Sequence, residues 1–338
     1  MSNTSSFIPE IHLEPLVDDP GFILLSDLGF EPTAYSPIAA SKPFPLFTPE
    51  AVRRIRAEIV DHETLANHMF SDDNNPCVVR GHCPDKARFT YDAWTHESVK
   101  ERVDQMAGIP ITIVYDYEIG HTNIQLGPRG WAGLKAEPDM PSAEGNLAVD
   151  AEIEPTVYKV PNWHKDSYPF VCILMLSETS TFKGGNTFIR KADGTNLVCP
   201  LPPIGHAMIL QGGLLDHAVS PTSASQERLS MVTSYRPSDP LQTDSCRLNT
   251  VRTVSEVPVL HKQWLDYRLK LLAERATKFA QTSDSQHLVE EMDRFIREQS
   301  NFLQESMKQM TDPVERVSTD TRGHFKNWLD AQAPTVVA

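Results

Sequence analysis

The apolar positions of the chain change their spacing near residue 111 and again near residue 256. Between these points, short runs of apolar and β-branched residues are separated by clusters of Gly, Pro, Asn and Asp. The run ITIVYDYEIG alternates apolar or aromatic residues with polar ones, which is typical of a half-buried strand. Further strand-like runs are FVCILML, GNTFIR, AMILQ and LSMVTSY. Many short strands with turn signals between them predict a mainly β sandwich or barrel rather than a parallel α/β sheet.

The segments before and after these strands have helical spacing. TPEAVRRIRAEIVDHETLANHMF begins with Thr48 as N-cap and Pro49 at the first helical position. THESVKERVDQMAG begins with Thr95 as N-cap and ends at Gly108. After residue 256, apolar residues recur at three-, four- and seven-residue spacings and are predicted to face a core: Leu260, Trp264, Tyr267, Leu271, Leu288, Met292, Phe295 and Phe302.

These patterns predict one mainly β domain framed by helices. Residues 1–47 contain many prolines and no sustained periodicity, which indicates an extended N-terminal arm over the body. Residues 48–255 then form the β core with its supporting helices. Residues 256–338 form a C-terminal helical extension packed on that core.

Composition and charge narrow the class of protein. An apolar fraction of 40% with 22% charged residues is that of a soluble globular protein. The formal net charge of −14 argues against nucleic acid as a partner, because phosphate backbones require a concentrated positive surface. The chain shows no secretory signal pattern, no apolar run as long as a membrane span, and no disulfide-framework spacing among its five cysteines. We therefore expect a cytoplasmic protein with no membrane partner.

Five residues in the strand-rich region have a spacing that suits a metal centre beside a carboxylate receptor. His164 and Asp166 are two positions apart in PNWHKDSYPF, and His217 follows in LQGGLLDHAVSP. Two imidazoles and one carboxylate can occupy one face of a six-coordinate Fe(II) and leave three positions open. Arg228 stands eleven residues after His217, and Ser230 stands two residues after Arg228. Residues two apart in a strand point to the same side, so this guanidinium and hydroxyl can together bind a carboxylate.

The motifs WHKD, DHAVSP and ERLSMVTSY resemble those of the iron(II)- and 2-oxoglutarate-dependent dioxygenases. The resemblance extends over about residues 110–237 through the strand pattern, and it implies a double-stranded β-helix, the jelly-roll or cupin-like fold. It also implies that Fe(II) is held by His164, Asp166 and His217. In that family, Arg228 and Ser230 would bind the distal carboxylate of the co-substrate 2-oxoglutarate, and O2 would be the second co-substrate. GGNTFIR resembles the family's glycine-rich turn into an inner strand.

Four further residues are candidates for contacts around this centre. Asn123 and Gln125 alternate onto one face of a strand in HTNIQLG and can hydrogen-bond the co-substrate or the substrate, although turn chemistry and sheet pairing explain them equally well. Trp163 either walls the site or packs outward. Arg190 ends GGNTFIR, where it either meets a substrate carboxylate or is a solvated strand end. His121 lacks a partner at ligand spacing and is interpreted as an ordinary histidine.

The resemblance implies an oxygenase that couples decarboxylation of 2-oxoglutarate to oxidation of an unactivated C–H bond, with release of succinate and CO2. The substrate would be hydroxylated, desaturated or cyclised. Because the negative charge disfavours nucleic acid, we expect a small-molecule substrate, as in similar fungal enzymes of secondary metabolism or amino-acid modification. A homodimer is compatible with the sequence.

Two other functions fit part of the pattern. A cupin-like metal enzyme that does not use 2-oxoglutarate would keep the three ligands, but it has no need of Arg228 with Ser230. A catalytically silent β-barrel binding protein would keep the fold. The intact triad argues against this second alternative, because a protein of this fold would lose its catalytic activity most simply by losing one metal ligand.

Overall fold

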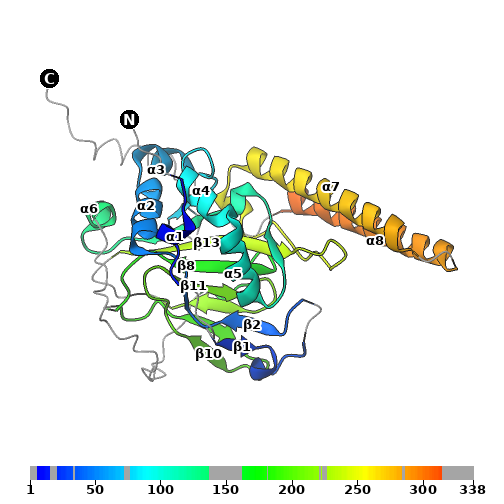
Figure 1. Cartoon of the computed structure of the whole chain (residues 1–338), viewed down its shortest axis with the longest axis horizontal. Coiled ribbons are helices and arrows are strands. Elements are labelled where there is room, and N and C mark those ends of the chain that lie inside the picture. Colours follow the sequence, from blue (N-terminus) through cyan, green and yellow to red (C-terminus); the bar gives the residue numbers. More distant parts are fainter. Residues whose placement is uncertain are drawn as a thin grey trace.

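Two antiparallel sheets form the centre of the protein, and helices frame them (Figure 1). This arrangement confirms the prediction of a mainly β architecture with supporting helices. The computed structural model describes residues 6–15, 21–32, 35–71, 77–136, 162–180, 182–220, 222, 227–283 and 286–313.

The larger sheet has the strand order β1-β2-β11-β8-β13-β7-β5-β4, with β3 paired to β11 and β6 paired to β13. Its strands within the described ranges are β1 Phe22–Leu24, β2 Ile38–Ser41, β3 Phe44–Pro45, β4 Met69–Phe70, β5 Val78–Val79, β6 Ile111–Ile113, β7 His121–Gln125, β8 Phe170–Met175, β11 His206–Leu210 and β13 Arg228–Pro237. The smaller sheet has the order β10-β9-β12, with β9 Thr187–Arg190, β10 Asn196–Cys199 and β12 His217–Val219.

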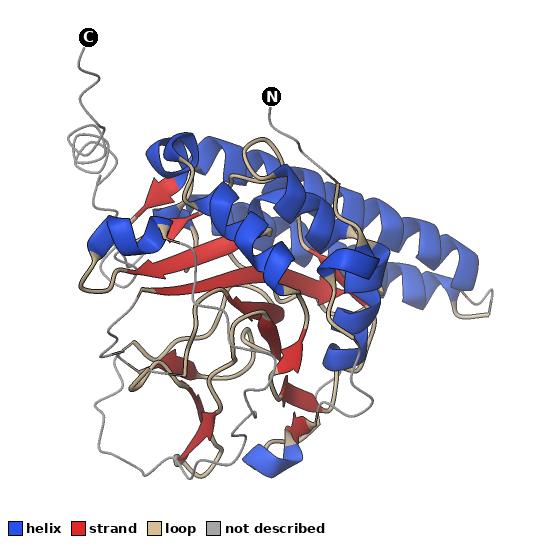
Figure 2. Cartoon of the chain, turned by 60° about the vertical axis from the view of Figure 1, so that its left-hand side comes forward, coloured by secondary structure: helices blue, strands red, loops and turns tan. Residues whose placement is uncertain are grey.

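Helices cover one face of the larger sheet, while the smaller sheet lies toward its other face (Figure 2). The helices are α1 Pro9–His12, α2 Pro49–Ile59, α3 His62–His68, α4 Arg88–Thr95, α5 Glu97–Ala107, α6 Gly130–Lys135, α7 Val257–Thr282 and α8 Leu288–Thr311. The part of the chain that the structure describes also contains three short 3-10 helices: η1 Ser26–Leu28, η2 Asp116–Glu118 and η3 Arg252–Val254. Among the helices that the structure describes, none combines the length and the apolar character needed to cross a bilayer.

Strand alternation divides the residues of the larger sheet between these two faces. In β8, Phe170, Cys172 and Leu174 belong to the main core under the helices. The alternate residues Val171 and Ile173 face the smaller sheet and a cavity between the sheets. The same alternation in β13 places Leu229 and Met231 in the main core and leaves the intervening side chains for the cavity.

The helix boundaries partly follow the predicted caps. The hydroxyl of Thr48 accepts a hydrogen bond from the Ala51 amide at the start of α2, as expected. The segment 48–70, which the sequence predicts as one helical stretch, is divided, because Asp61 caps a separate helix, α3. The prediction for Thr95 was wrong: it ends α4, and the ring of His96 caps α5 instead. The end of α5 at Gly108, in a left-handed conformation, was predicted correctly.

Two segments expected to be extended are built differently. The predicted strand over residues 111–120 stops at Ile113, and η2 then turns Glu118 into the interior, where it meets a buried arginine. Within the described part of residues 1–47, strands β1, β2 and β3 join the larger sheet, so this segment does more than lie over the body. The remaining residues of the arm, 1–5, 16–20 and 33–34, lie outside the described residues.

Helices α7 and α8 form a long antiparallel hairpin that projects from the body (Figure 1). Near the body, the predicted core positions are buried: Leu260, Trp264, Tyr267, Leu271 and Phe302. The prediction was wrong for Leu288 and Met292, whose exposed fractions are 47% and 44%. They lie in the first turns of α8, toward the projecting end of the hairpin (Figure 1). Residues 314–338 of the predicted C-terminal extension lie outside the described residues.

Candidate active site

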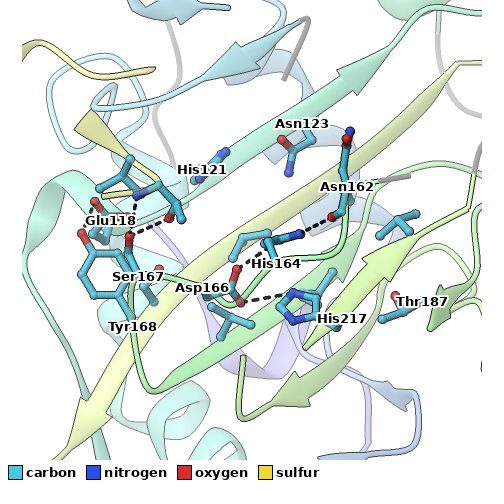
Figure 3. A pocket seen from close by; sticks show the side chains of 18 of the residues that line it. Glu118, His121, Asn123, Asn162, His164, Asp166, Ser167, Tyr168, Thr187 and His217 are labelled. Carbon is cyan, nitrogen blue, oxygen red and sulfur yellow. Dashed lines mark hydrogen bonds and ion pairs between the residues drawn. The ribbon is translucent and has the colours of Figure 1, made fainter. Parts of the chain in front are cut away.

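The three predicted metal ligands converge at one point (Figure 3). One side-chain ligand atom from each of His164, Asp166 and His217 lies within 4.8 Å of the others. The Nε2 atom of His164 is 3.6 Å from Oδ1 of Asp166, and Nε2 of His217 is 3.5 Å from Oδ2. Among the described residues, this is the one group of three or more His, Cys, Asp or Glu side chains close enough to share a metal ion.

Backbone pairing places these ligands. His164 and His217 form an antiparallel bridge in which each amide donates to the other carbonyl at 3.0 Å. The Asp166 amide donates to the carbonyl of Gly212 at 2.8 Å. A Cβ atom on Gly212 would lie 1.9 Å from Oδ2 of Asp166, and one on Gly213 would lie 2.6 Å from the Tyr168 carbonyl oxygen. The Gly-Gly pair is therefore needed for the two segments to approach this closely.

Hydrogen bonds to backbone carbonyls fix the tautomers of both histidines. Nδ1 of His164 is 2.8 Å from the Asn162 carbonyl oxygen, and Nδ1 of His217 is 3.0 Å from that of Leu215. A carbonyl only accepts, so each Nδ1 carries the proton and donates. Each Nε2 atom is therefore unprotonated and lies 3.5 or 3.6 Å from an oxygen of Asp166, which is the arrangement of a metal-ligating histidine.

The charges of the triad also suit a divalent cation. Burial alone would raise the pKa of Asp166, but the neighbouring imidazoles of His217 and His164 outweigh it and lower the pKa below its ordinary value. Burial lowers the pKa of His217. At neutral pH the triad therefore offers an ionised carboxylate and neutral imidazole, the protonation states that a metal requires. These residues fit a bound Fe(II) ion.

A cavity of about 350 Å³ opens beside the triad, between the two sheets. Side chains of β7, β8 and β13 form one wall, and Thr187 of β9 and Val219 of β12 lie on the other side. In β13, four alternate residues line it: Arg228, Ser230, Val232 and Ser234. The six residue-to-residue steps from Arg228 to Ser234 span roughly 20 Å, so this row is much longer than one small dicarboxylate.

Arg228 and Ser230 lie together in this cavity, as the sequence predicted for the carboxylate receptor. Nη1 of Arg228 donates to the hydroxyl of Ser230 at 3.0 Å, while its buried Nε has no partner among the described residues. Burial lowers the pKa of Arg228 to about 10, which leaves the guanidinium charged at neutral pH. A half-buried cation with an unused, buried donor is a receptor for an anion.

Asn123 and Gln125 lie on the same wall. In the sheet register, Asn123 is opposite Ser230 and Gln125 is opposite Arg228. Both side chains line the cavity. The side-chain amide of Gln125 also donates a hydrogen bond to the Thr222 carbonyl at 3.2 Å. The register thus brings the two predicted amides to the predicted receptor.

Trp163 and Arg190, the two predicted substrate contacts, lie outside the lining of the cavity. The guanidinium carbon of Arg190 lies 4.0 Å from the ring centroid of Trp163, so the two side chains stack on each other. Their predicted contact with substrate stays a prediction.

Two further residues line the cavity: Glu118, which sequence reasoning missed, and His121, which it interpreted as an ordinary histidine. Both contact the buried guanidinium of Arg80, whose Nη1 is 2.9 Å from Nδ1 of His121 and whose Nη2 pairs with Glu118. The Tyr168 hydroxyl donates to the same Glu118 oxygen at 2.8 Å. The alternation of His121 with Asn123 could have revealed the histidine, since both point to one face of β7. No comparable signal marked Glu118, which lies in a 3-10 turn.

Comparison with known proteins gives no match to a family model and no match to a curated protein. Solved structures do match. An oxidoreductase of the 2OG-Fe(II) oxygenase family from Burkholderia pseudomallei has 15% identity and a TM-score of 0.33, covering 49% of this chain and 70% of its own.

Two further matches are of the same kind. A prolyl-4-hydroxylase from Pseudomonas putida has 16% identity and a TM-score of 0.33, covering 64% of this chain and 93% of its own. AviO1 from Streptomyces viridochromogenes Tue57 has 12% identity and a TM-score of 0.38, covering 61% and 91%. At these identities and TM-scores, the similarity does not establish the function of this chain, which has to follow from the site itself.

Proposed function

We propose that the protein is a non-haem Fe(II)- and 2-oxoglutarate-dependent oxygenase with a double-stranded β-helix core. The observation that carries this proposal is the combination of two sites on one cavity. His164, Asp166 and His217 form a triad in which the Nδ1 atom of each histidine donates to a backbone carbonyl and its Nε2 atom lies beside the Asp166 carboxylate. Arg228, which is half-buried, and Ser230, which is buried, form a receptor for a carboxylate on the same cavity wall.

Each group has a separate role in this proposal. The triad holds Fe(II), which when bound together with 2-oxoglutarate and O2 supplies the oxidising power for C–H cleavage. Arg228 and Ser230 hold the distal carboxylate of 2-oxoglutarate and so orient its other end toward the triad. The side chains of Val171, Ile173 and Val232 give this part of the cavity an apolar lining.

The size of the cavity supports a small-molecule substrate. A volume of about 350 Å³ is at the lower end of the range of small-ligand pockets. Part of it is needed for the co-substrate, so the remaining space accommodates a metabolite rather than a folded macromolecule. Oxidation of such a molecule in secondary metabolism or amino-acid modification is the role that we propose.

The proposal is tested by anaerobic titration of the purified protein with Fe(II) and then with 2-oxoglutarate. We expect one Fe(II) per chain in the wild type, with His164→Ala, Asp166→Ala and His217→Ala each losing Fe(II) binding and turnover. The far-ultraviolet circular dichroism should be unchanged, because the triad lies at the edge of a cavity and not in the main core. His62→Ala, an exposed histidine of α3, is the control and should bind iron normally.

Two outcomes would contradict the proposal. Stoichiometric iron and full activity in any of the three triad variants would show that the metal is held elsewhere. Iron binding with no effect of 2-oxoglutarate on the spectrum of the iron-loaded protein would indicate a metal enzyme that does not use this co-substrate.

A further inference from the structure

A second hollow of about 400 Å³ lies on the outer side of the metal triad. His164, Asp166 and Thr250 line both this hollow and the inner cavity, so the two spaces meet at the triad. The outer hollow is formed by the triad segment, by residues 247–252, which lead into η3, and by the C-terminal end of α8. A molecule that reaches into the inner cavity from this side would keep its other end in the outer hollow.

The lining of this hollow is positively charged, in contrast to the protein as a whole. Four cationic side chains line it, namely Lys165, Arg247, Arg252 and Lys308. The acidic residues in its lining are Asp166, which belongs to the triad, and Asp312. The chain as a whole has a formal net charge of −14, so a concentration of cations beside the candidate metal site is not explained by composition.

Two of the four cations already have partners. Arg252 donates to the Gln309 and Asp312 carbonyl oxygens at the end of α8, and Lys308 pairs with Glu305. Lys165 and Arg247 differ, because both are exposed and their side chains have no ion pair within the described part of the chain. These two charges are therefore available to a ligand.

The backbone near these two side chains is fixed to the metal-binding segment. The Arg247 amide donates to the carbonyl of Ser167 at 2.7 Å, and the hydroxyls of Ser167 and Thr250 are 2.6 Å apart. Lys165 itself stands between the two ligands His164 and Asp166 in the sequence. Any ligand held by Lys165 and Arg247 is thus held at a defined position relative to the triad.

We propose that this outer hollow binds an anionic group of the substrate, a carboxylate, sulfate or phosphate, through Arg247 and Lys165. The inference rests on the proposed function and adds the substrate class to it: a small organic anion whose uncharged part extends toward the triad. Arg228 at the inner end and Arg247 at the outer end then receive different anions, the co-substrate and the substrate.

The test is isothermal titration calorimetry, in which inorganic phosphate is titrated into the metal-free protein at constant ionic strength. We expect saturable binding to the wild type. Arg247→Ala, alone and together with Lys165→Ala, should weaken it by about tenfold or more, the scale of losing a hydrogen bond to a charged group. Arg247→Lys should retain part of the affinity, since the charge remains. The control is Arg297→Ala, which removes an exposed arginine of α8 that pairs with Asp293.

A further variant separates the two anion sites. Phosphate binding should persist in Arg228→Ala. Binding that is lost in Arg228→Ala but unchanged in Arg247→Ala would place the anion at the co-substrate receptor and overturn the proposal. Absence of saturable binding to the wild type would overturn it as well. Because these titrations use metal-free protein, their failure is distinguishable from a failure to bind Fe(II) and 2-oxoglutarate.

The assignment of the anion to the substrate has its own readout. With Fe(II) and 2-oxoglutarate present, metabolites that bear a carboxylate or phosphate should stimulate succinate release more than their amide or dephosphorylated analogues do. This difference should shrink in Arg247→Ala. Equal stimulation by the neutral analogues would overturn the assignment.

Discussion

At the scale of single residues, the receptor formed by Arg228 and Ser230 gives the sharpest prediction. Arg228→Ala should raise the concentration of 2-oxoglutarate needed for half-saturation by roughly one to three orders of magnitude, because a carboxylate loses a charged, half-buried partner. Ser230→Ala removes one hydrogen bond and should cost about tenfold. The measurement is anaerobic titration of 2-oxoglutarate into the iron-loaded protein.

A matched variant separates charge from geometry at the same position. Arg228→Lys keeps a positive charge but loses the planar fork that can bind a carboxylate through two hydrogen bonds. We therefore expect an intermediate affinity for 2-oxoglutarate. If Arg228→Ala bound 2-oxoglutarate as tightly as the wild type, the carboxylate would have to be received elsewhere in the cavity.

Strand alternation made the grouping of Arg228 and Ser230 predictable from the sequence. Arg228 and Ser230 are two apart in β13, so their common side follows from the period of a strand. Glu118 was not predictable, because its position depends on a 3-10 turn and on a salt bridge to Arg80, 38 positions earlier in the chain. Long-range ion pairs leave no local pattern in a sequence.

At the scale of elements, the turn before β12 decides whether the ligands can meet. Gly212→Ala places a methyl group where Oδ2 of Asp166 lies, at a distance of 1.9 Å in the present geometry. The carboxylate has to rotate away from the two Nε2 atoms, so Fe(II) affinity should fall by at least about tenfold, the effect of losing one well-placed charged contact. Iron titration measures this loss.

The control for this prediction is a glycine in a turn far from the triad. Gly194 has no neighbour within 4 Å of its would-be Cβ, and its φ of +82° makes Gly194→Ala strained. This variant should lower stability slightly while leaving iron affinity unchanged. Equal iron affinity in Gly212→Ala and the wild type would show that Asp166 does not need the space beside Gly212.

Elements with strong local signals were predicted better than those formed by pairing. The strand β8 and the long strand β13 have continuous apolar or alternating runs, and both lie in the centre of the larger sheet. The strands β4 and β5 contain two residues each and exist through their partners. Thr95 fits an N-cap by residue type, but the preceding helix extends through it, and the cap moves to His96.

At the scale of the whole molecule, a buried ion pair joins the α7–α8 hairpin to the β body. Asp244 follows β13 in the chain, and one of its oxygens accepts hydrogen bonds from Arg268 at 2.6 Å and from the Tyr267 hydroxyl. The side chains of Asp244 and Arg268 are each only 3% exposed. Arg268 also donates to the hydroxyl of Ser306 at 2.7 Å, so this single guanidinium links both helices to the body.

Removal of the charge on Asp244 should therefore destabilise the protein. Asp244→Asn leaves the buried guanidinium of Arg268 without its counter-ion, and breaking a buried pair in this way costs about 3 kcal/mol or more. Thermal unfolding measures the loss. Asp266→Asn, which breaks the exposed pair with Lys262 on α7, is the control and should change stability by less than about 1 kcal/mol.

The same pair predicts how stability depends on pH. Burial alone would raise the pKa of Asp244, but Arg268 and the hydrogen bonds outweigh it, and the pKa is lower than the ordinary value. A carboxylate with a lowered pKa in the folded state stabilises the protein above the unfolded-state pKa of about 3.9, and this contribution is lost as the pH falls through the folded-state pKa. The difference in melting temperature between wild type and Asp244→Asn should therefore be constant from neutral pH to about pH 5 and shrink below about pH 4. A difference that persisted undiminished at pH 3 would show that Asp244 acts through its shape and hydrogen bonds and not through its charge.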